Sequence, residues 1–282
     1  MNVYLNDAWV AEAEASVSVF DRGFLYGDGC FETLRIADNK PLFWREHLNR
    51  LNTSLQALAI PYRADPQRWA EIAQHLIQQS PKTDAVLRIQ VTRGRGKRGY
   101  SAAGAVQPTV MASLHPTPTG ATEQGTAWRL ARSDMTQPRQ WLLNHHKTSN
   151  KLLQILGKTE AEAKGVDEVV FLNKDGLVTE TTSGNLFWLD GDHLVTPPLK
   201  TGILPGITRK IILDLCDTLS LPIKEHSVTW NEFIRTDVVF LTQSVWGIVA
   251  ISMIGDKVLE THHWVEDLKG AYQTSCDQAP FP

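Results

Sequence analysis

A stretch rich in proline, threonine and glycine near the middle of the chain limits the possible folds more than any other feature. Residues 114–125 read LHPTPTGATEQG, a composition that interrupts helices and strands alike. The 282 residues are enough for one large domain or two of ordinary size. We therefore expect a smaller α+β domain over residues 1–115, a linker over residues 116–125 and a larger domain over residues 126–282.

The N-terminal part combines short strands with two helices. Leu48, Leu51, Leu55 and Leu58 recur at helical spacing and predict an apolar stripe on a helix over residues 44–59. The other expected elements are a helix over residues 66–79 and strands at residues 3–5, 8–10, 16–19, 30–36, 87–93 and 109–114, of which the last two should pair. This pattern predicts a mixed sheet with helices on one side, as in a two-layer sandwich.

The C-terminal part contains many short strands, which suggest a barrel-like or strongly curved sheet. Strands are expected at residues 128–132, 168–172, 177–179, 186–189, 193–196, 237–241 and 249–253. Helices are expected from just after Lys147 to residue 164, where Gly165 suits a left-handed cap, and over residues 208–220 and 261–275. The fold class is therefore α+β, with a small sandwich domain and a larger barrel-like domain.

Composition excludes several function classes. A net charge of -3 gives no reason to expect binding to nucleic acid or to an anionic membrane. No apolar run approaches the ~20 residues of a membrane span, and the first residues lack the pattern of a signal peptide. Cys30, Cys216 and Cys276 have no metal-type spacing and leave one cysteine unpaired in any disulfide scheme. We expect a protein of the cytoplasm.

Lys147 is the first candidate chemical group. It lies in the segment NHHKTSNKLL, just ahead of an expected amphipathic helix. The positive end of a helix dipole, together with partial burial, would lower the pKa of its ammonium and favour the free amine. A free amine forms imines and serves as a proton-transfer base. The alternative is a solvated lysine in a connecting loop, which is the commoner situation of a lysine.

A carboxylate and a helix start supply two further groups. Glu180 follows a short expected strand, and a carboxylate there can hold a pyridine nitrogen protonated so that the ring accepts electrons. Gly206 opens an expected helix whose N–H groups, with the Thr208 hydroxyl, form a phosphate site. Arg50 offers a permanent cation for that phosphate. The alternatives are a solvated glutamate, a simple N-cap at Thr208 and a surface arginine.

Together, an amine, a carboxylate for a pyridinium and a phosphate site are what pyridoxal phosphate requires. The histidine pairs 145–146 and 262–263 bring no cysteine or carboxylate cluster with them, so we expect no metal.

A cationic loop follows the strand expected at residues 87–93. From Arg93 to Ser101 it reads RGRGKRGYS, with three glycines that let it bend and four cations that favour an anion. So much positive charge on a flexible loop of an acidic protein suits a carboxylated substrate. A solvated loop tip is the alternative.

These residues carry a resemblance to a known family. Over nearly its whole length the chain resembles the fold-type IV pyridoxal-phosphate enzymes, the group of branched-chain and D-amino-acid aminotransferases and 4-amino-4-deoxychorismate lyase. The motifs are FDRGFLYGDGCFET at residues 20–33 and EHLNRL at residues 46–51, with the segments around Lys147, Glu180 and Gly206. The resemblance implies pyridoxal phosphate as cofactor and a homodimer in which the small domain reaches toward the neighbour's site.

The resemblance also implies a role for each matching residue. Lys147 matches the lysine that forms a Schiff base with the cofactor, and Glu180 matches the partner of the pyridine nitrogen. Arg50 matches an arginine that binds the cofactor phosphate. The remaining phosphate contacts are matched by Gly206, Ile207, Thr208 and Ser244.

Within the group the chain is more similar to the lyases. The loop GRGKRGYS resembles their Gly-x-Gly-x-Arg-Gly-Tyr-Ser, and QSVWGI resembles their Asn-Ser-x-x-Gly-Ile, with Gln243 in place of asparagine. A further departure is Ala250, where a proline is usual. The similarity implies conversion of 4-amino-4-deoxychorismate to 4-aminobenzoate and pyruvate in folate biosynthesis, with Arg98, Tyr100 and Phe31 binding the substrate. An aminotransferase on the same fold is the alternative.

Overall fold

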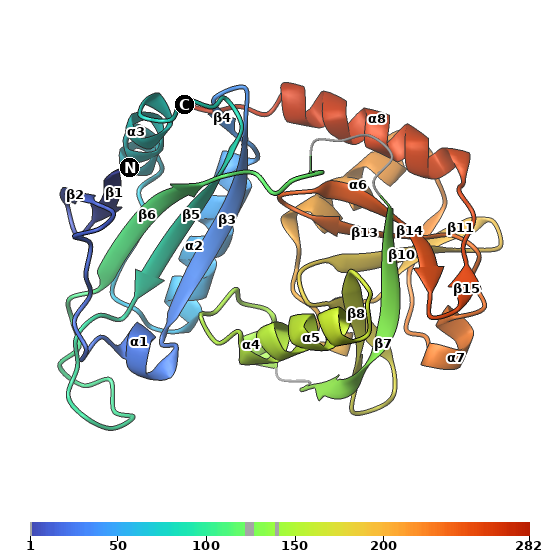
Figure 1. The fold of residues 1–282 in the computed structure, drawn as a ribbon, viewed down its shortest axis with the longest axis horizontal. Coiled ribbons are helices and arrows are strands. Elements are labelled where there is room, and N and C mark those ends of the chain that lie inside the picture. Colours follow the sequence, from blue (N-terminus) through green and yellow to red (C-terminus); the bar gives the residue numbers. More distant parts are fainter. Residues whose placement is uncertain (1, 122–126, 139–140) are drawn as a thin grey trace. The chain divides into compact units, whose positions relative to one another are not determined.

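The computed structural model describes residues 2–121, 127–138 and 141–282. They form two units, each with its own sheet (Figure 1). Unit 1 comprises Met1–Pro118, His146–Asn150 and Ala279–Pro282, and unit 2 comprises Thr119–His145 and Lys151–Gln278. The segment that carries Lys147 therefore belongs with the N-terminal unit, although the sequence on either side of it belongs to unit 2. Part of the expected linker, residues 122–125, lies outside the described residues.

Unit 1 is an antiparallel sheet with helices. Its strands are β1 (Asn2–Leu5), β2 (Ala8–Ala11), β3 (Gly29–Ala37), β4 (Lys40–Pro41), β5 (Ala85–Thr92) and β6 (Thr109–His115). Its helices are α1 (Arg22–Tyr26), α2 (Trp44–Ala57) and α3 (Pro66–Gln78). The strand order is β2-β1-β6-β5-β3-β4, and the expected pairing of β5 with β6 is confirmed.

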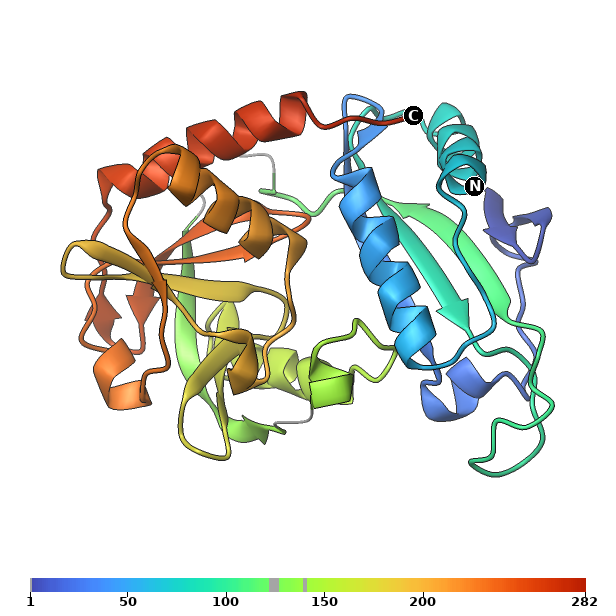
Figure 2. The same cartoon turned by 180° about the vertical axis from the view of Figure 1, so that it is seen from behind.

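The core of unit 1 lies between α2, α3 and one face of this sheet (Figure 2). The predicted stripe is confirmed, because Leu48, Leu51 and Leu55 are buried and Leu58 packs partly against the same core. The strand expected at residues 16–19 is wrong, since this segment pairs with no strand and exposes its valines. Helix α1 follows it instead, started by the Asp21 side chain, which accepts a hydrogen bond from Gly23 N.

Unit 2 carries the larger sheet. Its strands are β7 (Ala127–Gln137), β8 (Glu168–Asn173), β9 (Val178–Thr181), β10 (Asn185–Asp190), β11 (His193–Thr196), β12 (Ile223–Glu225), β13 (Val239–Gln243), β14 (Gly247–Ile254) and β15 (Lys257–Val258). Its helices are α4 (Trp141–Asn144), α5 (Leu152–Ala163), α6 (Ile207–Thr218), α7 (Trp230–Phe233) and α8 (His263–Asp277), with a 3₁₀ turn at Leu199–Thr201.

Strand pairing closes this sheet into a barrel. The order β10-β13-β14-β7-β8-β9 returns to its start because β9 also pairs with β10, with Asn185 opposite Glu180. On its other side Asn185 is opposite Thr242 of β13. The expected barrel-like sheet is therefore confirmed, and its closure sets Glu180, Asn185 and Thr242 in one row across three strands.

Helix α5 packs against β7 and β8 through small residues. Its buried residues are Gly157 and Ala161, whereas Leu152, Ile155 and Leu156 are exposed. Leu153, by contrast, packs partly against the cluster formed by Ala161, Val169 and Phe171. None of the helices in the described residues is both long and apolar enough to cross a membrane.

Alanine should have opposite effects at two helical glycines of unit 2. At Gly157 a Cβ would lie 2.5 Å from Cζ of Phe171, so the packing must shift, at a cost of about 1–3 kcal/mol. At Gly270, inside α8, a Cβ would meet nothing within 4 Å. Gly270→Ala should therefore raise the free energy of unfolding by about 0.5–1 kcal/mol through helix propensity alone. Urea unfolding measures both, and a stabilised Gly157→Ala variant would contradict the packing of α5.

Candidate active site

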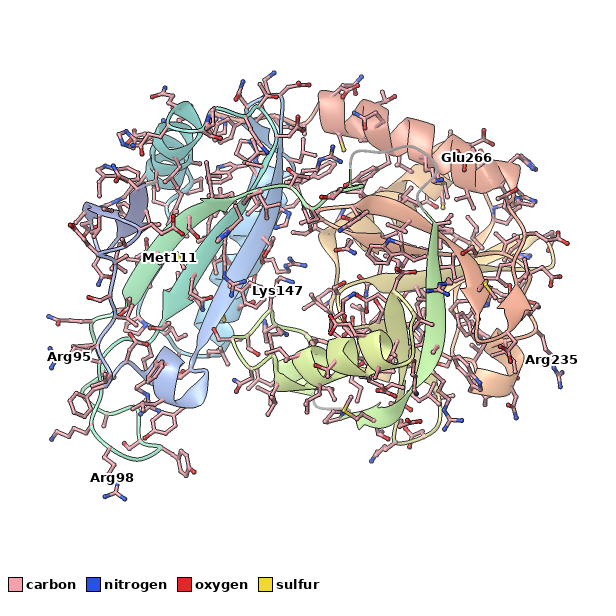
Figure 3. The ribbon with its side chains drawn as sticks, in the orientation of Figure 1. Arg95, Arg98, Met111, Lys147, Arg235 and Glu266 are labelled. Atoms are coloured by element: carbon pink, nitrogen blue, oxygen red, sulfur yellow. The ribbon has the colours of Figure 1, made fainter. Side chains whose placement is uncertain are left out.

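Backbone hydrogen bonds fix Lys147 beside the edge of β3. Phe31 N donates to Lys147 O at 3.0 Å, and Ser149 N donates to Gly29 O at 2.8 Å. Cys30 and Thr148 form an antiparallel bridge between them. Nζ of Lys147 lies 4.8 Å from the centre of the Phe31 ring, and Figure 3 shows the residue next to β3.

The helix expected just after Lys147 begins later in the structure. Helix α5 begins at Leu152 with Lys151 as its N-cap, so Lys147 precedes the helix. A helix dipole acts mainly within the first turn, which Lys147 does not reach. The lysine is instead positioned by a sheet, a more rigid support than a connecting loop.

A buried ion cluster lies on the face of β3 that packs against α2. The Glu32 carboxylate accepts hydrogen bonds from Arg50 Nε (2.8 Å) and Nη2 (2.7 Å) and lies 2.7 Å from His47 Nδ1. Burial raises the pKa of Glu32, but Arg50 and His47 outweigh it and hold that pKa at about 2. Burial lowers the pKa of His47 despite the Glu32 carboxylate, and the cations Arg50 and Lys147 lower it further. Glu32 therefore stays ionised and fixes the plane of the Arg50 guanidinium.

Arg88 is a second cation that lies close to the Phe31 ring, as Lys147 does. Cζ of Arg88 lies 4.1 Å from the ring centre, and its Nη2 donates to Gln90 Oε1 at 2.8 Å. Burial lowers the pKa of Arg88. Phe31 pairs with Gln90 and Thr33 with Arg88, so these side chains share the face of the sheet opposite the α2 core. This face places a partly desolvated cation close to the lysine.

The predicted substrate residues Arg98 and Tyr100 are exposed on the cationic loop. Tyr100 is 89% exposed, and Arg98 projects from the tip of the loop, away from Lys147 of the same unit (Figure 3). Arg93 does not belong to an anion site. It is buried, donates to Asp28 Oδ2 and is held by the carbonyls of Leu58 and Ala59. The expectation of four cations available to an anion is therefore wrong for Arg93.

In unit 2, Glu180 lies where the barrel closes. Its carboxylate accepts hydrogen bonds from Gln137 Nε2 (2.9 Å), Leu204 N (2.9 Å) and Asn185 Nδ2 (3.3 Å). All three groups are N–H donors, which suit an ionised carboxylate.

The start of α6 adjoins this carboxylate through Asn185. Gly206 is the N-cap, and a Cβ there would overlap with Asn185 Oδ1, so only glycine lets the helix begin so close. The simple N-cap at Thr208, the alternative considered from the sequence, is therefore wrong. The first N–H groups of a helix have no partner within it and attract anions.

Unpaired donors gather near this helix start. The buried Thr208 hydroxyl has no hydrogen-bond partner among the described residues, and the same is true of Thr242 Oγ1 and Gln243 Nε2 at the end of β13. A buried polar group without a partner costs about 1–3 kcal/mol. Helix α6 packs against β13, and Ser244 follows directly in the turn to β14. This concentration of unsatisfied donors marks a site for an anionic group.

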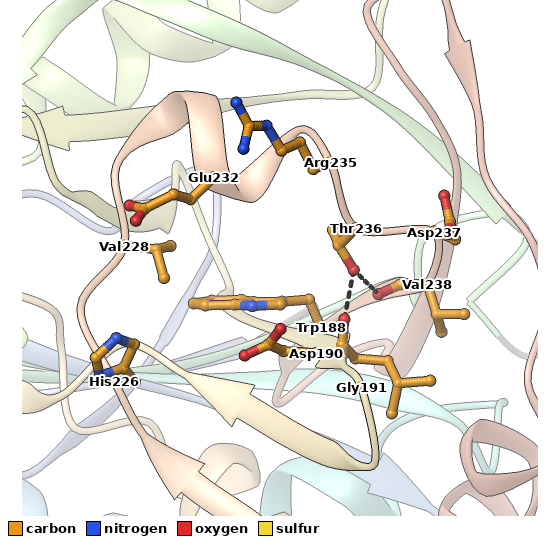
Figure 4. A pocket seen from close by; sticks show the side chains of 11 residues that line it. Trp188, Asp190, Gly191, His226, Val228, Glu232, Arg235, Thr236, Asp237 and Val238 are labelled. Atoms are coloured by element: carbon orange, nitrogen blue, oxygen red, sulfur yellow. Dashed lines mark hydrogen bonds between the residues drawn. The ribbon is translucent and has the colours of Figure 1, made fainter.

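A separate cavity of ≈ 520 Å³ in unit 2 contains none of the predicted site residues. Its lining side chains surround Trp188 (Figure 4). Two of its acids, Asp190 and Asp237, form ion pairs with Lys224 and Lys257, both at 2.9 Å, and its third, Glu232, accepts hydrogen bonds from Thr229. We therefore do not place the active site there.

Comparisons with known proteins agree with this arrangement. Residues 29–254 match the family model of amino-transferase class IV. A Methanocaldococcus jannaschii protein, provisionally named a branched-chain-amino-acid aminotransferase, is 32% identical over 92% of this chain and 90% of its own. Aminodeoxychorismate lyase of Bacillus subtilis is 30% identical over 89% of this chain and 86% of its own. The crystal structure of 4-amino-4-deoxychorismate lyase from Pseudomonas aeruginosa superposes with a TM-score of 0.85 at 28% identity, covering 98% of this chain and 99% of that one.

The chain belongs to the class IV aminotransferase family. These are fold-type IV enzymes that depend on pyridoxal phosphate, so the expected fold and cofactor are confirmed. The family includes lyases and aminotransferases, and membership alone does not decide between them.

The described residues fit this cofactor. In unit 2, the unpaired Thr208 hydroxyl and the helix start at Gly206 suit a phosphate, and the Glu180 carboxylate suits a pyridinium. In unit 1, β3 supports an amine at Lys147 and a fixed guanidinium at Arg50.

Sequence reasoning missed Glu32, His47 and Asn185. Glu32 occupies a position that faces the core by strand alternation, between Cys30 and Leu34, and an acid there signals a buried partner. His47 lies one turn before Arg50 on the same helix, so helical spacing also points to it. Asn185 could not be found, because its role depends on the pairing that closes the barrel.

Replacing Glu32 with glutamine should make the free energy of unfolding depend less on pH in acid. Its pKa of about 2 lies below the ordinary value of 4.5, so the ionised carboxylate stabilises the fold above pH 4.5. This contribution is lost as the pH falls from there toward about 2. Glu32→Gln should cost about 3 kcal/mol at pH 7, because Arg50 loses its buried partner, and should change less with acid.

Urea unfolding at a series of pH values tests this prediction. Glu46→Gln, at an exposed position of α2, should keep the wild-type profile. A Glu32→Gln variant with the wild-type loss of stability in acid would contradict the assignment.

Thr208→Val should stabilise the apo-protein and weaken cofactor binding. The change removes an unpaired buried hydroxyl, which should add about 1 kcal/mol to the free energy of unfolding. It also removes a hydrogen-bond donor to the cofactor phosphate, so the Kd of pyridoxal phosphate should rise about tenfold. Thr196→Val is the control, because that buried hydroxyl donates to Leu186 O at 2.8 Å. Thr196→Val should destabilise the apo-protein and leave the Kd unchanged. If Thr208→Val also destabilised the apo-protein without changing the Kd, that would argue against a phosphate site.

Proposed function

We propose that the chain is a 4-amino-4-deoxychorismate lyase of the cytoplasm, which forms 4-aminobenzoate and pyruvate for folate biosynthesis. The observation that carries the proposal is the loop from Gly94 to Ser101. Its sequence is lyase-like, its cation Arg98 and its Tyr100 are exposed, and its backbone is held by the buried Arg22 side chain. A loop of this kind suits a substrate that carries carboxylates.

In this proposal Lys147 is the lysine that binds the cofactor, and Glu180 is the partner of its pyridine nitrogen. Arg50, Gly206, Ile207, Thr208 and Ser244 bind its phosphate. Support comes from the N–H donors around the Glu180 carboxylate, the unpaired Thr208 hydroxyl and the fixed guanidinium of Arg50.

Lys147 moves the protons of the reaction. Bound pyridoxal phosphate supplies an electron sink that weakens the bonds at the amine-bearing carbon of the substrate. Nζ of Lys147 removes the proton from that ring carbon, and the bond to the enolpyruvyl oxygen breaks as the ring becomes aromatic. The same Nζ then returns a proton to the departing enolpyruvate, which becomes pyruvate. The edge of β3 keeps this amine in place throughout.

Two cations are available for the substrate carboxylates. Arg88 shares the Phe31 ring with Lys147 and can bind a carboxylate on that face of the sheet. Arg98 projects away from Lys147 of its own unit (Figure 3), and Tyr100 on the same loop is exposed. We assign them to the site of a second copy, in a homodimer.

The exposed apolar side chains of α5 support a homodimer. Leu152, Ile155 and Leu156 are 68%, 60% and 46% exposed. Three large apolar side chains on the exposed face of one helix are typical of a protein–protein interface.

An aminotransferase is the second candidate, favoured by the identity to the Methanocaldococcus jannaschii relative. One experiment separates the two. The enzyme is supplied either with enzymatically made aminodeoxychorismate, or with D-alanine or branched-chain amino acids and 2-oxoglutarate. The lyase predicts 4-aminobenzoate; rapid glutamate formation without 4-aminobenzoate would favour the aminotransferase.

Lys147→Ala should abolish turnover and the absorbance of the lysine-bound cofactor together. Lys158→Ala is the control, since this lysine of α5 is held by Asp167 O and should leave both unchanged. Spectra and 4-aminobenzoate formation measure the two effects. Full activity of Lys147→Ala would refute the assignment of the lysine.

A further inference from the structure

The guanidinium of Arg22 holds the backbone of the cationic loop. Its Nη1 donates to the carbonyls of Gly99 and Ser101, both at 3.0 Å, and its Nη2 donates to that of Tyr100 at 3.1 Å. One planar group thus binds three consecutive carbonyls, which fixes the backbone, while the Tyr100 side chain remains exposed.

Arg22 is itself held firmly. It is buried, its Nε donates to Asp28 Oδ2 at 2.8 Å, and its backbone N donates to Gly94 O at 2.9 Å. The same Asp28 oxygen accepts from Arg93 Nε at 2.7 Å. Burial raises the pKa of Asp28, but hydrogen bonds from Arg93 and Arg22 outweigh it and keep that pKa below its usual range. Arg22 is therefore a paired, immobile charge rather than a free one.

Tyr26, whose ring lies 5.1 Å from Cζ of Arg22, adds a further contact to the same loop. Gly99 N donates to its hydroxyl at 3.1 Å, and its ring lies 5.7 Å from that of Tyr100. Gly99 has a φ of 101°, which residues with a Cβ rarely adopt. Side-chain contacts from Arg22 and Tyr26 therefore hold the backbone of residues 99–101.

We infer that Arg22 is a positioning residue for substrate recognition, which orders residues 99–101 before the substrate binds. The inference rests on the proposed function, because that assigns Arg98 and Tyr100 to a substrate carboxylate. A loop ordered in advance loses less entropy on binding. Loss of Arg22 should therefore raise KM and leave kcat nearly unchanged, since the residue touches neither Lys147 nor the cofactor groups.

Arg22→Lys tests the inference, because lysine keeps the charge and lacks the planar fork. We expect amide hydrogen exchange at residues 99–101 and KM each to increase about tenfold, with kcat within about twofold of wild type. The substrate is whichever of aminodeoxychorismate and D-alanine the wild type turns over. Failure of the lyase assignment therefore leaves this test intact, because exchange and KM are still measured.

Tyr26→Phe keeps the test decisive if Arg22→Lys does not fold. It removes only the acceptor for Gly99 N and should raise exchange and KM about threefold. Arg63→Lys, at an exposed position of unit 1, is the matched control and should change neither. Unchanged exchange at residues 99–101, an unchanged KM, or a loss confined to kcat would overturn the inference.

Discussion

The hydrogen bonds between residues 146–150 and β3 are the interaction on which the proposed chemistry depends. They place Lys147 on a strand edge next to Phe31, in the same unit as the Arg50 guanidinium, although Lys147 comes nearly a hundred residues later in the chain. A sheet edge holds an amine more firmly than a loop, because each residue is fixed by its pairing with a strand inside the sheet. A lysine that must first bind a cofactor and then move protons needs this constancy of position.

In unit 2, closure of the barrel positions the Glu180 carboxylate, as pairing with β3 positions Lys147 in unit 1. The pairing of β9 with β10 sets Asn185 opposite Glu180, and Asn185 also adjoins the start of α6 at Gly206. A carboxylate and an anion site are thus joined by one asparagine. The unpaired donors nearby are costly in the apo-protein, and an anion such as the phosphate of the proposed site would offset that cost.

Much of the fold could be predicted from the sequence, because periodicity reports local structure directly. The stripe from Leu48 to Leu55 identified α2, and alternation identified β5. Barrel closure, the attachment of residues 146–150 to β3 and the burial of Arg93 could not be predicted, since each depends on contacts between distant segments. The exposure of Leu152, Ile155 and Leu156 on α5 could not be predicted either, because it depends on Gly157 and Ala161 packing against a distant part of the chain. The buried pairing of Glu32 could have been predicted, because strand alternation places this acid in the core, where a carboxylate requires a partner.

The most direct test of the account is to locate the covalent link between cofactor and protein. The holoenzyme is reduced with borohydride, digested and examined by mass spectrometry for a lysine that carries the reduced cofactor. We expect a single modified peptide, with the group on Lys147. A group on any other lysine, or a reduced protein that carries none, would contradict it.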